Sequence, residues 1–147
     1  MTLKNQITEV LKTSMRAKDL ATVTVLRSLQ AAIKQIEIDD RKELDDAQVL
    51  AVIEKQIKQR KESIKAFEGA NRGDLASKEQ AEIEVISQFL PAAMTEEELD
   101  SIIAQTISAQ EATSMKDMGK VMNSLRPLIA GRADPAQVSA KIKAKLS

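Results

Sequence analysis

Apolar residues recur three and four positions apart along nearly the whole of this 147-residue chain. The clearest stripe, formed by Val49, Ile53, Ile57, Ile64 and Phe67, lies along one side of a helical wheel. Such spacing is typical of an amphipathic α-helix with one face in a core. Runs of β-branched residues are few, and no pair of segments carries a hairpin signal. The sequence therefore predicts an all-α fold.

Capping residues mark where several of these helices begin. Asp45–Gln48 and Thr95–Glu98 each have the spacing of a capping box, in which the first and fourth side chains satisfy each other's backbone N–H groups. Asp19 is placed to cap the helix that follows it. Asp134 and Pro135 read as the N-cap and first residue of the last helix. These local signals predict the helix starts independently of the apolar pattern.

The combined pattern predicts seven helices. Pro127, which lacks a backbone N–H, falls inside the sixth and predicts a kink or an early end there. Gly131 can take the left-handed conformation that ends many helices, so a turn is expected at this position. In chain order, the apolar stripes or bounds of the helices are 3–15, 25–36, 49–67, 74–90, 99–107, 115–130 and 138–146.

The best domain boundary lies at residues 91–94, between Pro91 and Met94. The proline stops the fourth helix, and the second capping box opens the fifth directly afterwards. We therefore predict a four-helix N-terminal domain over residues 1–92 and a small three-helix C-terminal domain over residues 93–147.

The composition restricts the chemistry that this chain can perform. It contains no His and no Cys, which excludes imidazole bases, thiol nucleophiles and the usual zinc sites. No phosphate-binding glycine loop and no amidase serine–lysine signature is found. We therefore expect no catalytic residue, no metal and no cofactor. Phe67 and Phe89 are the only aromatic residues, so an aromatic platform for stacking RNA bases is not expected either.

Charge and hydropathy indicate the setting. The chain has 22 basic and 22 acidic residues, which argues against strong, indiscriminate binding to nucleic acid. It starts with no apolar leader, and no uncharged run approaches the roughly 18 residues of a membrane span. We therefore expect a soluble, cytoplasmic protein without a membrane partner.

One charged residue falls on an apolar stripe and calls for a partner. Arg60 lies on the same helix face as Ile57 and Ile64, where an unpaired charge would be costly. Beyond the turn at 69–73, Glu79 and Glu82 fall on the apolar face of the next helix. We interpret the three as a structural arginine–carboxylate pair with the arginine stem in the core. A ligand site is the alternative.

Two groups of basic residues are candidate RNA-binding surfaces. Residues 115–147 contain seven basic and two acidic residues, a local net charge of +5. Lysines near the end of the last helix also complement the helix dipole, so a structural role for them stays open. Three lysines on the third helix form a secondary basic face, which is equally typical of a solvated surface. The C-terminal candidates are Lys120, Arg126, Arg132, Lys141 and Lys145, and the secondary face consists of Lys58, Lys61 and Lys65.

Several motifs together resemble the GatB/YqeY family. The C-terminal match runs from Gly119, Val121 and Met122 to Gly131-Arg132-Ala133-Asp134. Upstream matches occur at 59–63, 72–75, 78–79 and 89–91, so the resemblance covers most of the chain. In this family the C-terminal module forms the tail of the B subunit of tRNA-dependent amidotransferases, and it also occurs in small stand-alone proteins. The chain is identified as a stand-alone, YqeY-like member.

The resemblance implies more about fold than about reaction. In the B subunit, the tail helps to engage the outer corner of tRNA, and of the matched motif residues only Lys120 (within the Gly-x-Val-Met run) and Arg132 suit phosphate contacts. The family also points to a carbon–nitrogen ligase that uses glutamine as amido-N donor, but the residues for that chemistry are absent here. Our first hypothesis is a non-catalytic accessory protein that binds tRNA or another RNA. The alternatives are a protein-interaction module that docks on a translation-related protein and a component of an amidotransferase assembly.

Overall fold

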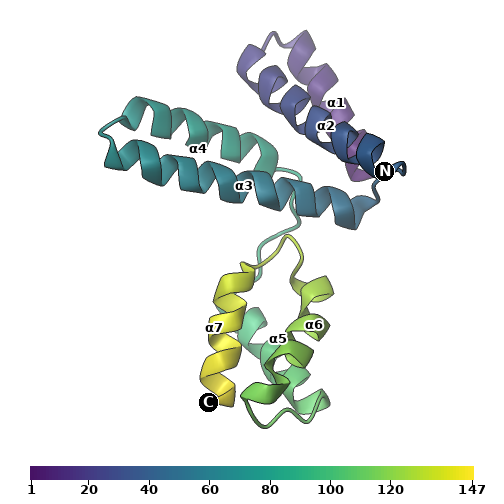
Figure 1. The fold of residues 1–147 in the computed structure, drawn as a ribbon. Helices are drawn as coiled ribbons and strands as arrows, with labels where there is room; N and C mark the ends of the chain where they lie inside the picture. Colours follow the sequence, from purple (N-terminus) through teal and green to yellow (C-terminus); the bar gives the residue numbers. More distant parts are fainter. The chain divides into compact units, whose positions relative to one another are not determined.

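The computed structural model describes residues 1–147 and contains seven α-helices, one short 3-10 helix and no strands. The predicted all-α class is therefore confirmed. The chain forms two compact units, Met1–Leu90 and Pro91–Ser147, which are described separately (Figure 1). The helices are α1 (Leu3–Arg16), α2 (Leu20–Asp40), α3 (Asp46–Gly69), α4 (Gly73–Ser87), α5 (Glu96–Ala109), the 3-10 helix η1 (Met115–Asp117), α6 (Met118–Ile129) and α7 (Pro135–Leu146).

The first unit is built from two helical hairpins. Helix α1 packs on α2, α3 packs along α4, and α4 also lies against α2. The core forms where the two hairpins meet, because the apolar stripes of all four helices converge there. Its most deeply buried side chains are Ile7, Leu26, Leu29, Val49, Ile53 and Ile86.

Local capping explains where helices of the first unit begin. Asp45 accepts a hydrogen bond from the Gln48 N–H at 2.9 Å, and the Gln48 side chain accepts one from the Asp45 N–H at 3.0 Å. This is the complete capping box that the sequence predicts. Asp19 caps α2 through the N–H of Thr22, also as predicted.

Two details of the first unit differ from the prediction. Met15, which its spacing places on the apolar stripe of α1, is 48% exposed, and Ser14 is buried instead. The face of α1 toward the core is centred on Leu3, Ile7 and Ser14, so Met15 lies about 100° past it. Helix α4 ends at Ser87, before the predicted end at Leu90.

The second unit consists of three helices that all contact one another, α5, α6 and α7. Ile103, Leu125 and Ile142 are fully buried at the centre, and the predicted inner face of α7 is buried along its length. Between α6 and α7, Gly131 has a φ of 72°, the left-handed conformation that the turn requires. Asp134 then caps α7 at the N–H of Ala136, with Pro135 as its first residue.

The second unit also departs from the sequence pattern in places. Thr95 accepts the N–H of Glu98 at 3.1 Å, but the returning bond of the predicted capping box is missing because the Glu98 carboxylate pairs with Arg132. The segment Met115–Asp117 is a 3-10 turn, so α6 starts only at Met118. Pro127 lies within α6, and the helix ends two residues later at Ile129.

Candidate nucleic-acid interface

Lys141 forms ion pairs with other residues of the second unit. Its ammonium lies 2.7 Å from Glu96 and 2.8 Å from Asp100, two carboxylates of α5. The hydrogen bonds that the Lys141 ammonium donates lower the pKa of both carboxyl groups. The same bonds raise the pKa of Lys141, and the bond to Asp100 has the larger effect. Gln137 adds a 2.7 Å bond to Glu96. Lys141 therefore joins α7 to α5.

Arg132 is also held by the unit itself. Its Nε donates to the carbonyl oxygen of Ala92 at 2.9 Å, and its Nη2 lies 3.4 Å from Glu98. Its own carbonyl oxygen accepts the N–H of Met94 at 3.0 Å. The turn after α6 is thus fastened to the segment before α5, and Arg132 has a structural role in addition to the phosphate role that the motif suggests.

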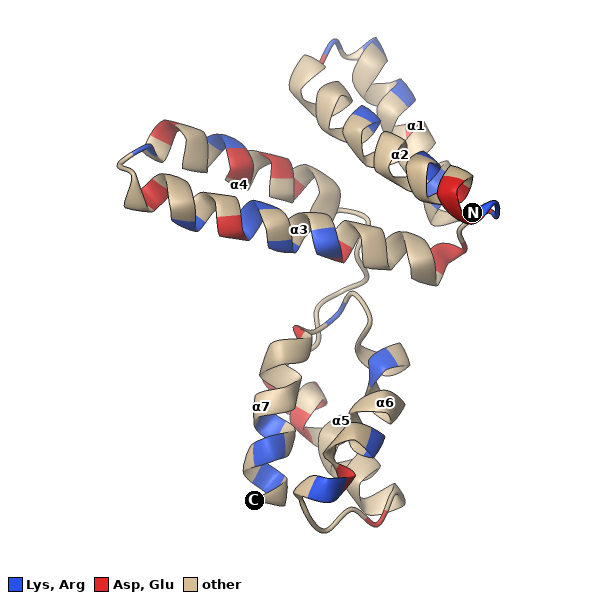
Figure 2. Cartoon of the chain, in the orientation of Figure 1, with Lys and Arg blue, Asp and Glu red and all other residues tan.

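The remaining three C-terminal candidates, Lys120, Arg126 and Lys145, are exposed and have no carboxylate within 4.0 Å. Lys120 makes one weak bond, 3.4 Å to the carbonyl oxygen of Gln110. Figure 2 shows the basic residues as bands on α6 and α7. Lys116 and Lys143, which the sequence analysis counted only in the net charge, are also exposed and also lack an ion pair. The unit therefore presents five cations that its own acids leave unpaired.

The secondary basic face lies on the exposed side of α3. Lys58, Lys61 and Lys65 are solvent-exposed and form no ion pair. Glu54 and Glu62 fall among them on the same helix face by their spacing. This alternation of charge weakens the face as a surface for phosphates.

Arg60 bridges α3 and α4. Its Nη1 lies 3.3 Å from Glu79 and also contacts Glu82. Arg60 thus pairs with both of the carboxylates that the sequence analysis named as its candidate partners. All three side chains are largely buried, at 17%, 23% and 20% exposed. Arg60 Nε and Gln56 Oε1 are buried without a hydrogen-bond partner. The cluster clamps the two helices together.

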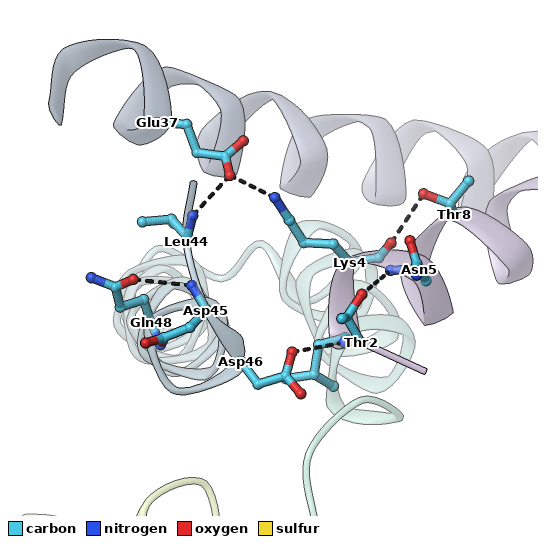
Figure 3. A network of polar contacts seen from close by, with 10 residues as sticks. Thr2, Lys4, Asn5, Thr8, Glu37, Leu44, Asp45, Asp46 and Gln48 are labelled. Atoms are coloured by element: carbon cyan, nitrogen blue, oxygen red, sulfur yellow. Dashed lines mark hydrogen bonds and ion pairs between the residues drawn. The ribbon is translucent and has the colours of Figure 1, made fainter. Parts of the chain in front are cut away.

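A polar junction in the first unit was missed by sequence reasoning (Figure 3). One Glu37 oxygen accepts both the Lys4 ammonium at 2.7 Å and the Leu44 N–H at 2.9 Å. These hydrogen bonds, chiefly that from Lys4, lower the pKa of Glu37, while Glu37 raises the pKa of Lys4. Asp46 accepts the N–H of Leu3 at 3.0 Å. No local signal could reveal contacts between residues this far apart in the sequence.

Beside this junction, α1 and α2 border an open cavity of about 280 Å³ lined by Lys4, Ile7, Thr8, Gln30 and Ile33, among others. No cluster of three or more acidic residues is arranged to hold a metal ion. No helix has the length and apolar character to cross a membrane.

The fold and the site define a small all-helical protein. It contains a helical hairpin, α3–α4, joined by the ion pairs of Arg60, and it continues in sequence to three helices that carry unpaired basic residues. The family model for the Yqey-like protein matches residues 4–146, and the chain belongs to that family. The membership predicted from the motifs is therefore confirmed.

Three fungal relatives share the name "Altered inheritance of mitochondria protein 41, mitochondrial". The protein of Pyrenophora tritici-repentis is 32% identical over 136 residues, covering 90% of this chain and 75% of the relative. That of Lachancea thermotolerans is 34% identical over 140 residues, covering 90% and 74%. That of Meyerozyma guilliermondii is 31% identical over 144 residues, covering 86% and 76%.

Proposed function

We propose that this protein is a non-catalytic accessory protein whose second unit binds structured RNA, with tRNA as the first candidate. The observation that carries the proposal is the set of five cations on η1, α6 and α7 that form no ion pair, although Glu96, Glu98 and Asp100 of α5 are paired with Lys141 and Arg132. The motif resemblance to the amidotransferase B-subunit tail supports the choice of tRNA. On this proposal, residues 93–147 are a tail-like RNA module and residues 1–92 its helical partner domain.

The proposed contact reads the backbone of the RNA and not its bases. Lysine and arginine side chains neutralise phosphates and release condensed counterions, which makes affinity dependent on salt. The second unit has no aromatic side chain on which a base could stack. With five cations at most, we expect a dissociation constant no tighter than about micromolar and a shallow log–log dependence on salt.

The location is a separate matter. The curated relatives are named as mitochondrial proteins, so the cytoplasmic location predicted from the sequence remains a prediction. Both compartments contain translation machinery, and the proposed RNA contact would operate in either.

The test compares two variants of equal charge change. Replacing Lys120, Arg126 and Lys145 with Ala removes three unpaired cations from the second unit, and replacing Lys58, Lys61 and Lys65 with Ala removes three from α3. Binding of unmodified tRNA is measured by fluorescence anisotropy at two salt concentrations, with circular dichroism to confirm folding. We expect the first variant to lose at least about tenfold in affinity and the salt slope to fall by about 2 to 3, while the second stays near wild type.

The opposite pattern would move the RNA contact to α3. Absence of binding by the folded wild type, even at low salt, would refute the RNA proposal and favour the protein-interaction module. Arg132 is left unchanged in this design because its removal would also break contacts to Ala92 and Glu98.

A further inference from the structure

Gly119 occupies a helical position where the protein itself has no need of a glycine. Its φ is not positive, unlike that of Gly131. Apart from its chain neighbours and the backbone of its own helical turns, a Cβ atom placed on Gly119 would meet no atom within 4 Å. Neither backbone conformation nor packing inside the unit therefore requires the missing side chain.

Glycine at such a position carries a cost. Within a helix it destabilises the fold relative to alanine, because it loses more conformational freedom on folding. Gly69 and Gly73 have equally open surroundings, but they flank the turn between α3 and α4. Gly119 is instead the second residue of α6, which follows η1 without an intervening turn. A close approach by a group from outside the chain would account for it.

The residues around Gly119 indicate what that group is. Gly119, Asn123 and Arg126 follow i, i+4 and i+7 spacing and form one exposed stripe, with Lys120 directly beside it. Helix α6 contains no acidic residue at all. The stripe thus joins two unpaired cations and one amide to a bare stretch of backbone, which is complementary to a negatively charged, hydrogen-bonding surface.

We infer that the sugar–phosphate backbone of a structured RNA lies across this face of α6, with Gly119 as the point of closest approach. Lys120 and Arg126 neutralise flanking phosphates, and the Asn123 side-chain amide donates a hydrogen bond to a phosphate oxygen or to a ribose hydroxyl. The inference rests on the proposed function and adds to it the helix face and the steric determinant of binding.

The experiment uses the full chain and replaces each of two glycines, Gly119 and Gly73, by a small and by a larger residue. Gly119→Ala and Gly119→Gln are compared with Gly73→Ala and Gly73→Gln as matched controls, since both sites are exposed and open. Each alanine variant should raise the melting temperature, by about 2–6 °C. Affinity for tRNA should fall about threefold with Gly119→Ala and at least about tenfold with Gly119→Gln, and it should not change in the Gly73 pair.

A simultaneous gain in stability and loss of affinity is the signature of a glycine kept for an external contact. If the wild type binds tRNA and both Gly119 variants bind equally well, this inference is overturned while the proposed function stands. If Gly119→Ala lowers the melting temperature, the site is not open and the inference is also overturned. A wild type that binds no RNA refutes the proposed function first.

Discussion

Arg60 carries a charge into the interface between α3 and α4, where water cannot fully solvate it. Two carboxylates of α4 compensate that charge through a single guanidinium nitrogen. Arginine suits this role because its charge is delocalised over several donors and its aliphatic stem packs among apolar neighbours. Arg60 Nε has no hydrogen-bond partner, so the guanidinium does not use all of its donors. The stabilisation from Arg60 therefore depends on its ion pairs with Glu79 and Glu82.

At the residue scale, the clamp predicts a large difference between two arginines of the same hairpin. Arg60→Ala leaves Glu79 and Glu82 partly buried and facing each other, so we expect a loss of about 2 kcal/mol in the free energy of unfolding. Arg72→Ala removes an exposed pair with Asp74, 56% and 65% exposed, and should leave the free energy of unfolding nearly unchanged. Urea denaturation of both variants measures the difference, and equal losses would show that Arg60 is no clamp.

At the element scale, the second unit is joined by ion pairs between α5 and α7. Lys141 lowers the pKa values of Glu96 and Asp100 below their ordinary 4.5 and 3.8. The stabilisation from these carboxylates is therefore present above the ordinary values and is lost as the pH falls through the lowered ones. The pKa of Lys141 is raised above 10.5, so its contribution is present below that value and is lost as the pH rises through the raised one.

This pairing predicts how one substitution changes the response to acid. Lys141→Met should reduce the drop in melting temperature between about pH 7 and about pH 3, because the carboxylates then have no partner to lose. Lys143→Met, which removes a neighbouring lysine without an ion pair, serves as the control and should keep the wild-type drop. Thermal scans by circular dichroism give the comparison. An unchanged drop in Lys141→Met would show that these exposed pairs contribute nothing.

The helix elements were predictable where the determinants are local. Asp45 with Gln48, Asp19 and Asp134 each satisfy backbone groups within three residues, so their roles can be read directly from the sequence. Glu98 shows the limit, because its choice of Arg132 over the Thr95 N–H depends on a residue 34 positions away. Lys141 likewise meets Asp100 across 41 positions. The RNA candidates could therefore be identified as cations, but their pairing could not.

At the scale of the whole molecule, the two units have separate apolar cores. No residue belongs to both, and the first is built from α1–α4 while the second is built from α5–α7. The second core is the smaller of the two, and a small core supplies less stabilisation by burial.

We therefore expect local damage to remain within one unit. Gly131→Val forces a β-branched side chain into a φ of 72° and should raise amide hydrogen exchange throughout Pro91–Ser147. Arg60→Ala should raise exchange within Met1–Leu90 instead. Hydrogen-exchange mass spectrometry on the full chain resolves the two regions. If either variant loosens both units equally, the units fold as one cooperative body.

The bond between the Leu3 N–H and Asp46 has a consequence for synthesis. A helix begins with N–H groups that lack an intrahelical acceptor, and α1 receives one of its acceptors from a residue 43 positions further along. During translation Leu3 is added to the chain 43 residues before Asp46. The start of the first helix is therefore completed only when the third begins to form, so the order of folding of these helices need not follow the order in which the ribosome makes them.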